Sequence, residues 1–87
     1  MKQKIGIVGI IVGNRRKNAP VVNKILSEHS EIIIGRMGIP QKDTDTGLIS
    51  LFVEGDTDKI GSLTGKLGMI KEVTVKSLLI PIKEDKE

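Results

Sequence analysis

The chain has 87 residues, 38% of them hydrophobic and 29% charged, with no cysteine, tryptophan or tyrosine and a formal net charge of +3. This length supports one small core, because a domain of this size buries only about 60–65% of the surface that its unfolded chain exposes. The lack of cysteine excludes disulfides, zinc–cysteine sites, iron–sulfur clusters and thiol catalysis, and it favours the reducing cytoplasm.

The first half of the chain predicts a strand, a helix and a second strand. Residues 5–12 are rich in β-branched side chains and end in a glycine–asparagine turn. Asn18 is placed to cap a helix over residues 19–29, in which apolar side chains recur at helical spacing. A run of isoleucines opens the second strand at residues 32–37, and Gly38-Ile39-Pro40 is predicted to stop it.

The second half repeats this order. Residues 48–53 predict a third strand, and the turn Gly55-Asp56-Thr57-Asp58 supplies a cap for a second helix that ends near Gly68. Residues 73–80 predict a fourth strand. The order βαββαβ predicts an α+β, ferredoxin-like sandwich. In it, a four-stranded antiparallel sheet carries both helices on one face, with the first and third strands in the centre.

We expect residues 1–82 to form this single domain and residues 83–87 to form a charged tail. The fold hosts enzymes, electron carriers, RNA-binding modules and ligand sensors, so function has to be argued from sites. Phe52 is the only aromatic residue, which argues against the base stacking of an RNA-binding module. No apolar run approaches the ~20 residues of a membrane span, so no membrane association is expected.

The strands carry apolar residues in both phases of their alternation. A sheet covered by helices on one side should instead alternate between apolar and polar residues. We therefore predict that the helix-free face is covered by a homo-oligomer contact, in a dimer or a tetramer. The alternative is that these are ordinary scattered surface aliphatics. The residues assigned to the oligomer interface are Val8, Ile10, Leu48 and Phe52.

The turn after the first strand is the candidate ligand site. It combines a flexible glycine, two amide side chains, three cations and the start of a helix, which together favour a carboxylate or a phosphate, including an amino acid. The alternative is a solvated basic loop. The residues assigned to the site are Gly13, Asn14, Arg15, Arg16 and Asn18.

Other motifs predict no cofactor and no enzyme. The glycines of the first strand lack the spacing of a dinucleotide fingerprint, and Asp43-Thr44-Asp45 lacks the later ligands of a calcium loop. No nucleophile–base pair or carboxylate dyad is visible. His29 is the only histidine, so the remaining alternative is a metal-responsive sensor with His29 at a subunit interface; the plainer interpretation is a histidine in the last turn of a helix.

Residues 51–68 and 73–76 resemble the iron-only hydrogenase system regulators. These are small stand-alone proteins similar to ACT domains and to the C-terminal domain of the nickel-responsive repressor. The specific part is Ile-Gly-x-Leu-x-Gly-Lys-Leu-Gly at residues 60–68, and Arg36-Met37-Gly38-Ile39-Pro40 is similar to the end of the family's second strand. The resemblance implies an ACT-like fold and a regulatory function. The repressor's metal ligands and DNA-binding segment are missing, so a small ligand or a protein partner is expected instead of DNA.

Overall fold

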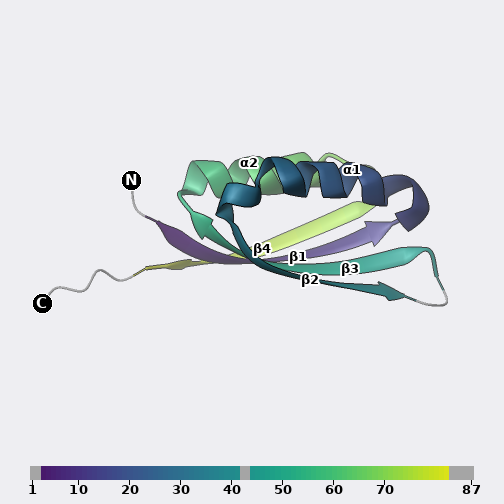
Figure 1. The fold of residues 1–87 in the computed structure, drawn as a ribbon, viewed down its shortest axis with the longest axis horizontal. Helices are drawn as coiled ribbons and strands as arrows, with labels where there is room; N and C mark the ends of the chain where they lie inside the picture. The colour runs from purple at the N-terminus through teal and green to yellow at the C-terminus, as the bar shows by residue number, and fades with distance from the viewer. Residues whose placement is uncertain (1–2, 42–43, 83–87) are drawn as a thin grey trace, which may run out of the picture.

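The computed structural model describes residues 3–41 and 44–82 (Figure 1). The elements are β1 (Lys4–Gly13), α1 (Arg15–Glu28), the short 3-10 helix η1 (Ser30–Ile32), β2 (Ile33–Gln41), β3 (Thr46–Gly55), α2 (Thr57–Gly68) and β4 (Val73–Pro81). The predicted βαββαβ order is confirmed. The predicted charged tail, residues 83–87, lies outside the described residues.

The four strands form one antiparallel sheet in the order β2-β3-β1-β4, so β1 and β3 are central as predicted. Both helices lie over the same face of this sheet, and no described element covers the opposite face (Figure 1). No helix in the described part of the chain combines the length and the apolar character that a membrane crossing requires.

The core fills the space between the sheet and the two helices. Its buried members are Val8, Ile10, Val12, Val22, Leu26, Ile32, Leu51, Val53, Ile60, Leu63, Leu67 and Val73. The prediction that Val8 and Ile10 face away from the helices is therefore wrong. Val8 pairs with Leu51 and Ile10 pairs with Ile49, and directly paired residues share a face of the sheet.

Helix α1 begins at Arg15, four residues before the predicted start. Its N-cap is Asn14, which adopts a left-handed conformation (φ 49°) that asparagine tolerates better than most residues. The predicted cap, Asn18, lies inside the helix and is 5% exposed. Its Nδ2 group donates to the carbonyl oxygens of Gly13 (2.7 Å) and Lys71 (3.0 Å), so Asn18 ties α1 to the end of β1 and to the loop before β4.

Strand β2 continues through Gly38-Ile39-Pro40, which was predicted to stop it. Because β2 is an edge strand, a proline can sit there without removing a hydrogen bond from the sheet. The predicted start of α2 is confirmed, with the Asp56 carboxylate accepting from the N–H of Lys59 at 2.8 Å. Gly68 is the last residue of α2, and the C-cap is Met69 in a right-handed conformation, so the predicted C-cap glycine is wrong.

Gly6 and the glycines of α2 have opposite surroundings. A Cβ atom on Gly6 would lie 2.9 Å from side-chain atoms of both Leu79 and Val53, so Gly6 lets the core close over β1. A Cβ atom on Gly61, Gly65 or Gly68 would meet nothing within 4 Å. The glycines of α2 therefore do not serve close packing against the sheet, because these positions face away from it into open space.

Candidate functional site

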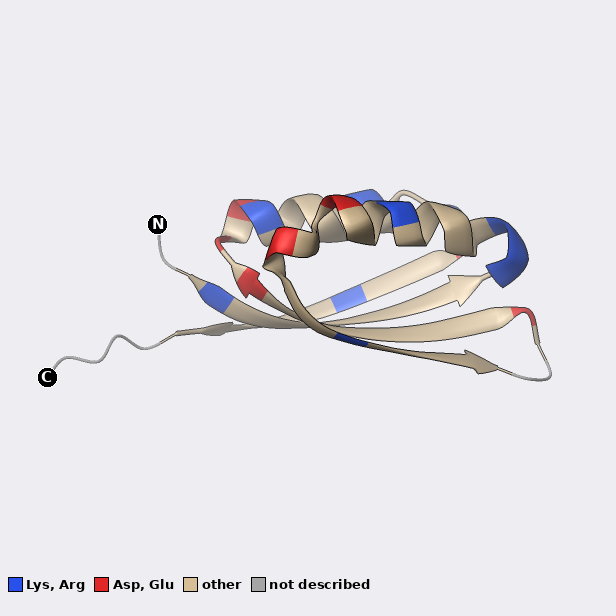
Figure 2. Ribbon diagram, in the orientation of Figure 1, with Lys and Arg blue, Asp and Glu red and all other residues tan. Residues whose placement is uncertain are grey.

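Asp45, in the connection between β2 and β3, occupies the N-terminus of α1. The N–H of Arg15 donates to the carbonyl oxygen of Asp45 at 2.9 Å, and the N–H of Arg16 donates to its Oδ1 at 3.2 Å. The acidic end of the β2–β3 hairpin thus faces the basic start of α1 (Figure 2). A carboxylate at a helix N-terminus is favoured by the exposed N–H groups and the helix dipole. The protein therefore places its own anion where the sequence predicted a ligand.

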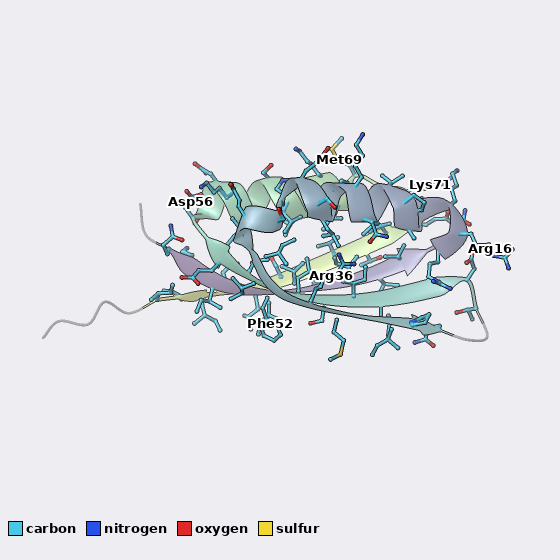
Figure 3. All side chains as sticks on the ribbon, viewed as in Figure 1. Arg16, Arg36, Phe52, Asp56, Met69 and Lys71 are labelled. Atoms are coloured by element: carbon cyan, nitrogen blue, oxygen red, sulfur yellow. The ribbon has the colours of Figure 1, made fainter. Side chains whose placement is uncertain are left out.

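The residues of the predicted ligand turn point in different directions. The N–H of Gly13 donates to the carbonyl oxygen of Glu72 at 2.8 Å, and both donors of the Asn18 amide are used inside the fold. Arg16 extends outward from the end of the molecule (Figure 3). Asn14 is exposed and serves as the N-cap of α1. Arg15 alone among them lines a cavity between α1 and the β2–β3 hairpin.

This cavity, the hairpin cleft, has a volume of about 160 Å³. It exists because Gly38, Pro40 and Gly47, which the pairing register places on the helix-facing side of the hairpin, have short side chains or none. The space beneath the start of α1 is therefore left unfilled. The cleft is lined by Val12, Arg15, Ala19, Val22, Asn23, Arg36, Gly38, Ile39, Pro40, Gly47, Leu48 and Ile49.

Two arginine side chains from different elements line the hairpin cleft. Arg36 reaches from β2 toward α1 (Figure 3), and its Nη2 donates to Oδ1 of Asn23 at 3.2 Å. The stem of Arg15 lies against Gly47, where a Cβ atom would come within 2.9 Å of Arg15 Cδ. Arginine pairs bidentately with carboxylates and phosphates, and the floor of the cleft is apolar. The arrangement can therefore hold a small organic anion.

Arg36 was missed as a site residue when the sequence was considered alone. It stands in an apolar strand and has no motif around it that indicates a ligand. Its place in the site follows from its pairing with Leu51, which puts Arg36 on the helix-facing side of the sheet. The signal would have been a cation in the same alternation phase as core residues, and that phase is known only once the register is known.

His29 makes contacts within the chain through both ring nitrogens. Nδ1 lies 2.8 Å from the carbonyl oxygen of Ile25, and Nε2 lies 3.4 Å from Oγ of Ser62, so the ring joins α1 to α2. Within residues 3–41 and 44–82, no group of three or more histidine, cysteine and acidic side chains is placed to hold a metal ion. No observation therefore favours the metal-responsive alternative.

The helix-free face of the sheet, here the open face, is predominantly apolar. Phe52 points away from the helices (Figure 3), and Leu48 is half-buried in the same phase of β3. Ile7 and Ile11 of β1 pair with Phe52 and Leu48, so they occupy the face that was assigned to Val8 and Ile10. The exposed large apolar residues of the open face are Ile7, Ile11, Met37, Ile39, Phe52, Leu78 and Ile80.

A family profile and a solved structure are both similar to this chain over nearly its whole length. The profile of the TM1266-like family, described as "Iron-only hydrogenase system regulator, putative", matches residues 4–77. The solved structure of the uncharacterized protein TM1266 from Thermotoga maritima is 38% identical with a TM-score of 0.85, over 94% of this chain and 100% of that one. A comparison with curated proteins finds no match.

Two further solved structures share the fold at low identity. CPII, a nitrogen regulatory PII-like protein from Thiomonas intermedia K12 bound to ADP, AMP and bicarbonate, is 13% identical with a TM-score of 0.57, over 98% of this chain and 100% of that one. SnoaB, a cofactor-independent oxygenase from Streptomyces nogalater, is 10% identical with a TM-score of 0.54, over 98% of this chain and 97% of that one. Because one is a regulator and the other an enzyme, this likeness speaks for the fold alone.

Proposed function

Because this chain belongs to the TM1266-like family of iron-only hydrogenase system regulators, we propose that it is a non-catalytic, oligomeric regulatory protein that senses a small organic anion in the hairpin cleft. The observation that carries the proposal is that two arginines, Arg15 and Arg36, are among the residues that line one small and mostly apolar cleft. The fold positions them, since one comes from the first turn of α1 and the other from β2.

The cleft indicates the size and chemistry of the ligand. A hydrogen bond from a guanidinium to a carboxylate or phosphate contributes about 1.5–3 kcal/mol before solvent screening. Val12, Val22 and Ile49 offer apolar contact to the rest of the ligand. A volume of about 160 Å³ suits an amino acid or a short-chain carboxylate and is small for a nucleotide.

The β2–β3 hairpin connects the cleft to the open face. Gly38 and Pro40 face the cleft, whereas Met37 and Ile39 belong to the opposite alternation phase, whose side chains stand on the open face, so Ile39 lines the cleft from between Gly38 and Pro40. An anion that bridges Arg15 and Arg36 would hold the hairpin at one distance from α1. A ligand shifts an equilibrium between two states only if it binds one of them more tightly. Here the two states would differ in the distance between the hairpin and α1, and therefore in the shape of the open face.

Isothermal calorimetry against small organic anions, including amino acids, short carboxylates and phosphate esters, tests the ligand. Arg15→Ala and Arg36→Ala should each weaken binding of a ligand found in this way by about tenfold or more, equivalent to roughly 1.4 kcal/mol. Arg16→Ala is the matched control, because Arg16 lies on the same turn and extends outward. Binding that is equally weakened in all three variants, or unchanged in the first two, would contradict the proposed site.

A further inference from the structure

We infer that two copies of this chain pack face to face through their open faces, with Phe52 of each copy seated over Gly9 of the other. This arrangement rests on the oligomeric part of the proposed function and specifies its geometry. Four strands of nine or ten residues give the open face about 600 Å² per copy. An apolar surface of this extent is at the upper end of what soluble monomers leave uncovered, so it calls for a partner.

The open face carries a protrusion and a depression. Phe52 is 48% exposed and points straight away from the helices (Figure 3). Gly9, on the neighbouring strand, leaves the backbone uncovered, and a Cβ atom there would meet nothing within 4 Å. A depression of about 330 Å³ lies over Gly9, with Ile11, Leu48 and Thr74 among its lining residues. An aromatic ring can fill this apolar space.

The positions of the protrusion and the depression permit a symmetric pair. Phe52 pairs with Ile7, and Gly9 pairs with Ser50, so the two features lie on adjacent strands two residues apart along the sheet. A two-fold axis can lie midway between the facing sheets and parallel to them. If it runs along the perpendicular bisector of the line from Phe52 to Gly9, it exchanges these two positions. Each ring then meets the other copy's depression, which is the self-complementary contact of a two-fold dimer.

The charges of the open face fit the same axis. Among the described residues, the register places only two charged side chains there, Glu54 opposite Ile5 and Lys76 opposite Gly9. In a flat layout with about 4.8 Å between strands and about 3.4 Å per residue, the axis carries Lys76 to a position that is offset from Glu54 of the partner subunit by about 3 Å in the plane of the sheets. The two long side chains then span the ~10 Å between the facing sheets. Opposite charges therefore meet twice in the dimer. This agreement favours a second copy over an unrelated protein as the occupant.

Light scattering and sedimentation of the purified chain test the contact. We expect a particle of twice 9.5 kDa at micromolar concentration. Gly9→Val fills the depression, and Phe52→Ser removes the protrusion, so each should raise the dimer dissociation constant by about tenfold or more. Gly61→Ala is the control, because it adds a side chain in equally open space on α2. Circular dichroism and the thermal midpoint verify that each variant is folded.

Charge reversal tests the orientation independently. Glu54→Lys and Lys76→Glu should each raise the dimer dissociation constant by about tenfold, because each puts like charges together at both contacts. In the double variant the dissociation constant should return to within about threefold of the wild-type value. A monomeric wild type would overturn both this arrangement and the oligomeric proposal. An oligomer that is unaffected by Gly9→Val and Phe52→Ser, or is not rescued by the double reversal, would overturn the arrangement alone. Anion binding is measured separately by calorimetry.

Discussion

Replacing Asn18 by alanine should destabilise the fold strongly, although the sequence alone places this residue in a ligand site. The side chain is 5% exposed and donates two hydrogen bonds, to the carbonyl oxygens of Gly13 and Lys71. Each lost bond costs about 1 kcal/mol, and more where an acceptor stays buried without a donor, so Asn18→Ala should cost about 2–3 kcal/mol. In a domain of this size that lowers the thermal midpoint by about 10–20 °C.

Asn18→Asp separates the loss of donors from the loss of volume. The side chain keeps its shape, but an ionised carboxylate only accepts hydrogen bonds and would face two carbonyl oxygens. The folded state therefore disfavours the charged form and raises the pKa of the introduced carboxyl above the ordinary ~3.9 of aspartic acid. Between ~3.9 and the raised value the folded state holds a proton that the unfolded state has released. The stability of this variant should then fall as the pH rises through that window.

Thermal unfolding of the wild type and both variants at pH 4 and pH 7 measures these effects. The change in thermal midpoint of the wild type between the two pH values is subtracted from the corresponding change in each variant. Lys17→Ala is the control, because it removes an exposed side chain from the same helix outside the cleft. An Asn18→Ala variant that melts with the wild type but loses anion binding would refute the reasoning, since Asn18 would then act as a ligand donor.

Two further substitutions test the surroundings of the hairpin cleft. Asp45→Ala removes the carboxylate that accepts from the N–H of Arg16, and it should lower the free energy of unfolding by about 0.5–2 kcal/mol, as chemical denaturation can measure. Gly47→Ala should weaken anion binding severalfold in calorimetry, because the added Cβ would lie 2.9 Å from Arg15 Cδ and displace that side chain; unchanged affinity would show that the position of Arg15 does not matter.

The sequence was sufficient for the topology, because each element has a local signal. The β-branched runs, the cap at Asp56 and the helical spacing of Ile60, Leu63 and Leu67 all reappear in the structure. The start of α1 was misplaced because Asn18 has the chemistry of a cap, and the same amide group serves equally well as a buried donor. Only the position of Lys71, far along the chain, distinguishes these roles.

The two faces of β1 could not be told apart from its own sequence. β-Branched residues occupy both alternation phases, so a shift of one residue exchanges the core face and the open face without any local penalty. The assignment follows from the pairing of Val8 with Leu51, which is a contact between distant segments. The hairpin cleft was hidden for the same reason, because Arg15 and Arg36 come to line one cleft only after α1 has folded over the sheet.

The glycines on the outer side of α2 bear on how this helix forms. Three of its twelve residues are glycine, and the two interior ones, Gly61 and Gly65, each cost about 1 kcal/mol of helix propensity relative to alanine. The isolated segment therefore has little tendency to coil in water. Its order comes from the buried side, where Ile60, Leu63 and Leu67 enter the core. Coiling and docking of α2 should thus be one cooperative event, in which the helix acquires its shape from the sheet that it covers.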